Sequence, residues 1–327
     1  MGHKIGLMHL RVLTAQDLRA ALDMPTAIDA MRIAFGQLSS GAATIPVRTG
    51  LKAGPVTLLT MPGALADPPA LGAKLVSVAV ENRDEGLPAV HAVVVLLDPR
   101  TGAPMALMDG EWLTALRTGA GSGLATELLA LPEASTLAVI GAGAQARSQI
   151  EAVRAVRPIR EIRIHSRTRA SAEALALELR GVDVRLTDTA AVAVEGAQVV
   201  VTATDASLPV IPGGVAPGTH INAVGGYRPD MQEIPSSITG RARVVVDQLE
   251  GALAEAGDVI IPISEGVLTR ADLVELGAVM NGDSPGRITT EEVTLFKSVG
   301  NAAQDLAVAR VALDRAVERG LGTVVEG

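Results

Sequence analysis

The residues with the clearest chemical purpose follow the pattern Gly-x-Gly-x-x-Ala, which begins at Gly141. In a strand–turn–helix unit, the first glycine permits a tight bend and the second lets the backbone approach a phosphate, while the small last residue keeps the helix near its strand. The chain has 34 glycines, so the bare pattern also suits a plain glycine turn. An apolar run before it, residues 137–140, and a helix-compatible segment after it, residues 145–156, favour a dinucleotide pyrophosphate site at the positive helix end. The expected binding residues are Gly141, Gly143, Ala144, Gln145 and Ala146.

The residues after the next strand indicate which dinucleotide binds. An NAD site usually has Asp or Glu about 20 residues beyond the glycines, where it holds the ribose 2′-OH. Here the strand-like residues 162–165 lead into Ser166, Arg167, Thr168 and Arg169, without a carboxylate. Either arginine can pair with a 2′-phosphate and both hydroxyls can donate to it; the alternative is solvated arginines at a helix start. The segment favours NADPH, with NADH as the second choice.

Two further residues stand out because their surroundings are apolar. Lys74 lies within the strand-like residues 72–78, where an unpaired charge is costly. It therefore either meets an anion or points to solvent from an edge strand. His91 lies among valine and alanine in the strand-like residues 90–98, and a hydrogen-bonded core histidine is the simplest interpretation. The histidines are scattered and cysteine is absent, so no metal site is expected.

From residue 136 onward, strands alternate with helices, which is typical of a doubly wound parallel sheet of Rossmann type. The period becomes helical again from residue 289 to about residue 319. The expected strands are residues 137–140, 162–165, 182–186, 198–203, 220–224 and 243–247, with a helix at residues 170–179.

The first part of the chain has a different pattern of expected helices and strands. Residues 14–40 are expected to be helical, with Thr14 as an N-cap and Pro25 in a first helical turn. Strand-like runs then follow one another without helices between them, which predicts a small, largely antiparallel sheet. These runs are residues 56–61, 72–78 and 90–98.

A long helix over residues 109–131, ended by Pro132, is expected to bridge two domains. A length of 327 residues also favours two domains over one. We therefore expect an α/β chain. Residues 1–117 and 296–327 would form a smaller α+β domain, and residues 118–295 a Rossmann domain.

Composition argues against several functional classes. Aromatic residues make up 1% of the chain and its net charge is −8, so binding of nucleic acids by stacking or by charge is not expected. The absence of cysteine excludes disulfides and thiolate chemistry. Residues 1–5 lack the apolar core of a signal peptide, and no apolar run is long enough for a membrane span. These features favour a cytoplasmic protein without membrane partners.

Ordered blocks of residues from about residue 40 to 310 carry a resemblance to a known family. They include Gly86-Leu87-Pro88, Asp98-Pro99-Arg100-Thr101-Gly102, Met108-Asp109-Gly110-Glu111-Trp112, Ile221-Asn222-Ala223-Val224-Gly225 and Phe296-Lys297-Ser298-Val299-Gly300. In this order, the blocks strongly resemble the ornithine cyclodeaminase/mu-crystallin family. The resemblance implies a homodimer, with the N-terminal sheet and the C-terminal helix forming the interface and the substrate floor. It also implies cofactor contacts at Thr202, Ala203, Thr204, Val224 and Gly225.

The members of this family handle a C=N bond next to a carboxylate, with hydride passing to or from a nicotinamide. The resemblance places the family's carboxylate clamp at Arg48, Lys74 and Arg117. Arginine suits bidentate binding of a carboxylate, and lysine adds a compact charge. The resemblance also places the strand of His91 beside the substrate, so this histidine is either a pocket residue or a core residue.

One position departs from part of the family. Cyclodeaminases and the family's alanine dehydrogenase have a catalytic aspartate where this chain has Tyr227, whereas the mu-crystallin-type members resemble it in the following Arg228-Pro229-Asp230. Without that aspartate, activation of water or ammonia is disfavoured. Asp230 either handles the proton or caps a turn, and Tyr227 either binds the substrate or shapes the pocket.

The sequence hypothesis is therefore an NAD(P)H-dependent oxidoreductase that reduces a small cyclic ketimine carboxylate, with Lys74, Arg117 and Asp230 as catalytic candidates. Its substrate would be Δ1-pyrroline-2-carboxylate or the six-membered analogue, giving L-proline or L-pipecolate. The alternatives are an ornithine cyclodeaminase, an alanine dehydrogenase, and a non-catalytic NADPH-binding protein.

Overall fold

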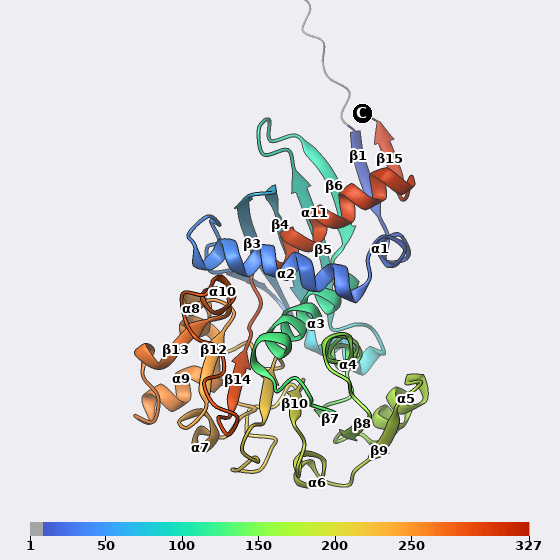
Figure 1. Cartoon of the computed structure of the whole chain (residues 1–327). Helices are drawn as coiled ribbons and strands as arrows, with labels where there is room; N and C mark the ends of the chain where they lie inside the picture. Colours follow the sequence, from blue (N-terminus) through green and yellow to red (C-terminus); the bar gives the residue numbers. More distant parts are fainter. Residues whose placement is uncertain (1–8, 327) are drawn as a thin grey trace, which may run out of the picture. The chain divides into compact units, whose positions relative to one another are not determined.

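The computed structural model describes residues 9–326, so the expectation for residues 1–5 lies outside the described part. The chain divides into two compact units, which are described separately below (Figure 1). Unit 1 comprises Met1–Arg117 and Asn301–Gly327, and unit 2 comprises Thr118–Gly300. The boundary falls inside helix α3, Gly110–Leu129, which is therefore shared by both units.

Unit 1 contains a seven-stranded sheet in the order β15-β1-β6-β5-β4-β3-β2. Neighbouring strands are antiparallel except for β1 and β6, which confirms the expected largely antiparallel sheet. The predicted runs 56–61 and 72–78 lie within β3 and β4, and the run 90–98 matches β5 except for its last residue. The strands are β1 His9–Leu13, β2 Thr49–Ala53, β3 Val56–Ala66, β4 Pro69–Val78, β5 Val90–Leu97, β6 Pro104–Asp109 and β15 Thr323–Glu326, with the 3-10 helix η1 at Val80–Glu85.

The helices of unit 1 begin at the signals expected from the sequence. Thr14 caps α1, Ala15–Ala21, in a capping box with Asp17, and Pro25 lies in the first turn of α2, Met24–Ser39. Helix α11, Ala302–Arg319, packs against α2 and against β3, β4 and β5. One face of the sheet is thus covered by α11, and residues on that face are buried beneath it.

Unit 2 contains an eight-stranded sheet in the order β13-β12-β14-β11-β10-β7-β8-β9, and all of its strand pairs are parallel. The order reverses at β7, as in a doubly wound sheet, so the expected fold class is confirmed. The strands are β7 Thr136–Ile140, β8 Glu161–His165, β9 Asp183–Leu186, β10 Val199–Thr202, β11 His220–Ala223, β12 Arg243–Val246, β13 Leu273–Glu275 and β14 Thr294–Lys297.

The unit 2 sheet is buried on both faces, because alternate residues of one strand enter different cores. Leu137 and Val139 of β7 pack in one core with helices α4 and α5, while Ala138 and Ile140 pack in the other. The helices are α4 Ala144–Val156, α5 Arg169–Glu178, α6 Ala190–Val194, α7 Ser236–Thr239, α8 Leu249–Glu255, α9 Gly257–Ser264 and α10 Leu276–Asn281, with the 3-10 helix η2 at Arg270–Asp272.

One expectation for the second half of the chain was wrong in part, and one strand was missed. Residues 289–319 were expected to be helical throughout, but Thr294–Lys297 forms the interior strand β14, and the helix begins only at Ala302. A four-residue apolar run is too short to show its period, so helix and strand look alike there. Strand β13 was not expected either. None of the helices in the described part of the chain is long and apolar enough to cross a membrane.

Candidate active site

In unit 1, two basic side chains share one buried carboxylate. Lys74 Nζ of β4 lies 2.9 Å from each oxygen of Asp305, and Arg117 Nε donates to Asp305 Oδ1 at 3.0 Å. Arg117 also donates to Gln304 Oε1 at 2.9 Å. All four side chains are buried. We refer to Lys74, Arg117 and Asp305 as the cation cluster.

The charges of the cation cluster act strongly on Lys74. The pKa of Lys74 falls from 10.5 to about 7, because burial, first, and the charges of Arg117 and Arg48 lower it by more than Asp305 raises it. The half-buried Arg48, in the segment before β2, is therefore close enough to add to the positive potential. With Lys74 protonated, two cations face one anion, so the cluster carries a surplus positive charge.

Sequence analysis missed Asp305 and Gln304. Both lie in the first turn of α11, after the N-cap Asn301, where acidic and polar residues are common for reasons of capping and helix dipole. The available signal was the position of Asp305 within an otherwise apolar helix face, which places the carboxylate in the core.

His91 is not part of this cluster. On β4, Gly72 and Lys74 face α11, because a β-carbon on Gly72 would lie 3.0 Å from Leu306 of that helix. His91 pairs with Ser77, which lies on the opposite face. The ring is exposed and its Nδ1 lies 2.7 Å from Glu111 Oε1, so the interpretation as a core histidine was wrong.

In unit 2, the glycine turn between β7 and α4 has the geometry that a pyrophosphate requires. Gly141 has φ of 102°, and a β-carbon there would lie 2.5 Å from the carbonyl oxygen of Ala203. Gly143 is the N-cap of α4 without a side-chain cap, and a β-carbon there would meet no atom within 4 Å. Ala146 is fully buried against the sheet. Gln145 Oε1 is buried without a hydrogen-bond partner among the described residues. These features fit an anion at the helix end.

The two arginines after β8 differ in the ion pairs that they form. Arg169 contacts Glu173 at 3.1 Å and Asp188 at 3.4 Å. The side chain of Arg167 is 91% exposed and lies 4.0 Å from Asp205. Ser166 Oγ accepts a weak bond of 3.4 Å from the backbone N–H of Thr168. Arg167 is thus the arginine that is freer to meet a phosphate.

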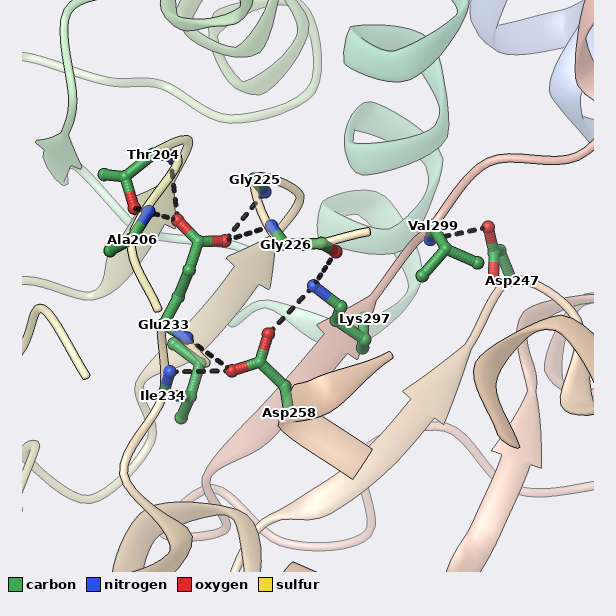
Figure 2. A network of polar contacts seen from close by, with 10 residues as sticks. All are labelled: Thr204, Ala206, Gly225, Gly226, Glu233, Ile234, Asp247, Asp258, Lys297 and Val299. Carbon is green, nitrogen blue, oxygen red and sulfur yellow. Dashed lines mark hydrogen bonds and ion pairs between the residues drawn. The ribbon is translucent and has the colours of Figure 1, made fainter. Parts of the chain in front are cut away.

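The loops after β10 and β11 are held together by a buried carboxylate that sequence analysis missed. Glu233 accepts hydrogen bonds from Thr204 N and Oγ1 at 2.8 and 2.7 Å, and from Gly225 N and Gly226 N at 2.7 and 3.2 Å (Figure 2). The Val224 N–H donates to the carbonyl of Thr202 at 3.0 Å. Because Thr204 Oγ1 donates to Glu233, the hydroxyl of Thr204 is already engaged in a hydrogen bond within the protein.

The glycine at position 225 is required by packing between these loops. A β-carbon on Gly225 would lie 2.1 Å from the carbonyl oxygen of Thr204. Thr202, at the end of β10, is buried, and its Oγ1 has no hydrogen-bond partner among the described residues. The residues expected to bind the cofactor thus meet at the carboxyl edge of the sheet.

Asp258 and Lys297 complete this buried network. Asp258 Oδ1 accepts from Glu233 N and Ile234 N at 2.7 and 2.8 Å, and its Oδ2 lies 2.8 Å from Lys297 Nζ (Figure 2). Lys297 Nζ also donates to the carbonyl of Gly226 at 2.6 Å. We refer to Glu233, Asp258 and Lys297 as the acid cluster; all three are buried.

Tyr227 and Asp230 lie at the exposed tip of the loop after β11. Both oxygens of Asp230 accept from Arg228, at 3.0 and 3.1 Å, and these bonds lower the pKa of Asp230. A carboxylate with a lowered pKa is a weak base and holds no proton to donate at neutral pH. The geometry gives Asp230 no support as a catalytic residue.

The fold and these sites define a class of proteins in which a doubly wound sheet of the dinucleotide-binding type is joined to an α+β unit with a buried cluster of basic side chains. Within this class, the chain belongs to the ornithine cyclodeaminase/mu-crystallin family, whose family model matches residues 8–320.

Three similar proteins are full-length matches. A Δ1-pyrroline-2-carboxylate reductase of Bacillus cereus is 40% identical over 322 residues, which cover 96% of this chain and 99% of that protein. The structure of the Thermococcus litoralis Δ1-pyrroline-2-carboxylate reductase in complex with NADH and L-proline matches with a TM-score of 0.93 and 40% identity, covering 96% of this chain and 100% of that one. An archaeal alanine dehydrogenase dimer with bound NAD matches with a TM-score of 0.92 and 34% identity, covering 97% and 99%.

Proposed function

We propose that the protein is an NAD(P)H-dependent reductase of small cyclic ketimine carboxylates, with Δ1-pyrroline-2-carboxylate as substrate and L-proline as product. The full-length similarity to Δ1-pyrroline-2-carboxylate reductases supports this substrate. Tyr227, in place of the family aspartate, favours reduction of a preformed imine over cyclisation of ornithine or deamination of alanine.

The observation that carries the proposal is the surplus positive charge of the cation cluster. A buried charge needs a partner, and among the residues that the structure describes, Lys74 and Arg117 share the single carboxylate of Asp305. A substrate carboxylate would supply the missing negative charge. Arg117 has five N–H donors, of which the described contacts with Asp305 and Gln304 use two. Arg48 would add a further contact from its loop.

Lys74 is the group best suited to give a proton to the imine nitrogen. Its pKa of about 7 leaves both protonation states populated near neutral pH, as a proton donor requires. Binding of an anionic substrate beside it favours the charged form, so the ammonium group is protonated when the substrate is present. Nζ then donates its proton to the nitrogen, and Asp305 holds the side chain in place. A bound nicotinamide would supply the hydride for the neighbouring carbon.

The cofactor is expected on unit 2, at the glycine turn and the loops after β10 and β11. We infer that NADPH is preferred to NADH, because no carboxylate follows β8 and Arg167 is available for a 2′-phosphate. The related structures contain NADH or NAD, so the preference within this chain rests on Arg167 and its neighbours.

We also propose a homodimer formed through unit 1. The sheet face opposite α11 exposes apolar side chains, including Leu51, Leu75 and Val93, of which Leu51 is 64% exposed. Such a face favours burial against a partner. A second copy of the chain is the expected occupant, because the similar alanine dehydrogenase is a dimer.

A substrate panel tests the proposed function. The purified protein is assayed with NADPH and with NADH against Δ1-pyrroline-2-carboxylate, its six-membered analogue, alanine and ornithine. We expect NADPH oxidation with the cyclic imines and formation of the L-amino acid. Ammonia release from ornithine, or NAD(P)+ reduction with alanine in the absence of imine turnover, would overturn the proposal.

A further inference from the structure

The acid cluster lies where the nicotinamide half of a cofactor is expected, an argument that rests on the cofactor site of the proposed function. The glycine turn follows β7, and the segment that reads the ribose 2′ position follows β8. Strands β10 and β11 lie on the other side of β7 in the sheet. In a doubly wound sheet a dinucleotide crosses the carboxyl edge at such a reversal, so its second half would be expected near the ends of β10 and β11.

The contacts of Glu233 indicate that its carboxyl group is ionised. Each oxygen accepts two hydrogen bonds, and all four donors are N–H or O–H groups of Thr204, Gly225 and Gly226. No lone-pair direction is left for a proton. Burial and the charge of Asp258 raise the pKa of Glu233 above its ordinary value, and the positive charge of Lys297 and the bonds from Thr204 offset part of this rise. The four donors stabilise the charged form at neutral pH.

The acid cluster therefore carries a surplus negative charge. Lys297 is 2.8 Å from Asp258 and neutralises one carboxylate, which leaves the charge of Glu233 uncompensated within the cluster. In a buried environment such a fixed charge acts over a longer distance than in water. It favours any ligand that bears a positive charge near the loops after β10 and β11.

We propose that Glu233 is a positioning residue with an electrostatic effect on the cofactor: it holds the loops after β10 and β11 together, and the surplus negative charge of the acid cluster strengthens binding of the oxidised cofactor relative to the reduced one. The nicotinamide ring is cationic when oxidised and neutral when reduced, so a fixed anion distinguishes the two forms. Asp258 acts through the backbone of Glu233, to which it is hydrogen-bonded, and Lys297 acts through the carbonyl of Gly226.

The test measures the dissociation constants of NADP+ and NADPH, using NADPH fluorescence and its displacement by NADP+, without turnover. Glu233→Gln keeps the shape but removes the charge. We expect it to raise the ratio of the NADP+ constant to the NADPH constant by about three- to tenfold, as for loss of a nearby unit charge. The variant also loses hydrogen bonds from Thr204 or Gly225, and this loss is expected to weaken binding of both the oxidised and the reduced cofactor.

Two further variants test the sign of the effect at alkaline pH, where the carboxyl groups stay ionised. Asp258→Asn leaves the cluster neutral, so the ratio is expected to rise. Lys297→Gln leaves two negative charges, so the ratio is expected to fall. A purely structural role would not move the ratio in opposite directions in the two variants. The pair also replaces Glu233→Gln if that variant fails to fold.

Gln198→Met serves as a matched control in the same sheet. Gln198 Oε1 accepts from Ser135 N and Thr136 N at 2.8 and 3.3 Å, at the amino ends of β7 and β10. Its loss is expected to lower the melting temperature without changing the ratio. An unchanged ratio in folded Glu233→Gln, or shifts in the same direction for Asp258→Asn and Lys297→Gln, overturns the inference. A wild-type chain that binds both cofactor forms but reduces no imine overturns only the proposed function.

Discussion

The two units each bury a three-residue ion cluster, and the clusters are opposite in sign. In unit 1, Lys74 and Arg117 share the carboxylate of Asp305, whereas in unit 2 Lys297 pairs with Asp258 and leaves Glu233 as a second anion. The clusters also differ in what satisfies them. The carboxylate of Glu233 accepts hydrogen bonds from backbone N–H groups and from Thr204, while the described partners of Lys74 and Arg117 are side chains.

This difference underlies the two proposed roles, binding of the substrate by the cation cluster and positioning of loops by the acid cluster. The cation cluster keeps N–H donors available, so a small anion can complete it. Both oxygens of Glu233 in the acid cluster already accept two hydrogen bonds each. This cluster can therefore act on a ligand through its electrostatic field and through the loops that it holds in place. In our proposals, each surplus charge is matched to a different molecule, an anionic substrate in one case and a cationic ring in the other.

The largest expected effect comes from removing the proton donor of the cation cluster. Lys74→Met keeps the length of the side chain but removes the ammonium group. We expect kcat for imine reduction to fall by about 10²- to 10⁴-fold, the usual contribution of a positioned acid. Steady-state kinetics would show this, and the exposed Lys52→Met in β2 is the control. A kcat within threefold of wild type would remove Lys74 from the mechanism.

The next effect is expected on substrate binding. Arg117→Met leaves Lys74 paired with Asp305 and cancels the surplus charge, so the KM for the imino acid should rise by about 30-fold or more. The affinity for NADPH, measured by fluorescence, should change much less because the cofactor is expected on unit 2. An equal loss of both affinities would contradict the separation of roles between the clusters.

The pH dependence tests the electrostatics of the cation cluster. The charged, proton-donating form of Lys74 is present below its pKa of about 7, so kcat/KM for reduction should fall about tenfold per pH unit well above that value. Asp305 raises this pKa, so Asp305→Asn should move the descending limb to lower pH and reduce activity at pH 7 by about tenfold. Identical profiles for both proteins would show that another group controls the rate.

The sequence allowed the glycine turn of unit 2 to be placed because the signal is local. Gly141, Gly143 and Ala146 lie within six residues, between a strand and a helix that both show in the sequence pattern. Lys74 stood out by its apolar surroundings, and the resemblance to the family gave it a role and added Arg117. Neither route identified Asp305, since its partner Lys74 is 231 residues away in the chain and only the fold brings them together.

Glu233 and β14 were missed for related reasons. An isolated glutamate after a loop looks like a surface residue, and only burial shows that it holds Thr204 and Gly225. Strand β14 is a four-residue run next to a helix, and its position between β12 and β11 depends on pairing with distant strands. Local patterns predict elements, whereas long-range pairs determine the ion clusters.

A smaller effect is expected for the cofactor preference of unit 2. Arg167→Ala should raise the dissociation constant for NADPH by about three- to tenfold, because an exposed arginine pairs with a phosphate in a screened setting. The constant for NADH should stay within twofold, since it has no 2′-phosphate. Titration of both cofactors against wild type and Arg169→Ala compares the exposed arginine with the engaged one. Equal losses for NADPH and NADH would contradict the role of Arg167.

The smallest effect is expected for Asp230, which belongs to neither cluster. Its carboxylate is exposed and paired with Arg228, and its lowered pKa leaves it without a proton near pH 7. Asp230→Asn should therefore change kcat/KM by less than about twofold, as is usual for an exposed ion pair. The same variant should also leave the descending pH limb at the position set by Lys74. A loss of tenfold or more would instead assign Asp230 to proton transfer and would weaken the assignment of that role to the cation cluster.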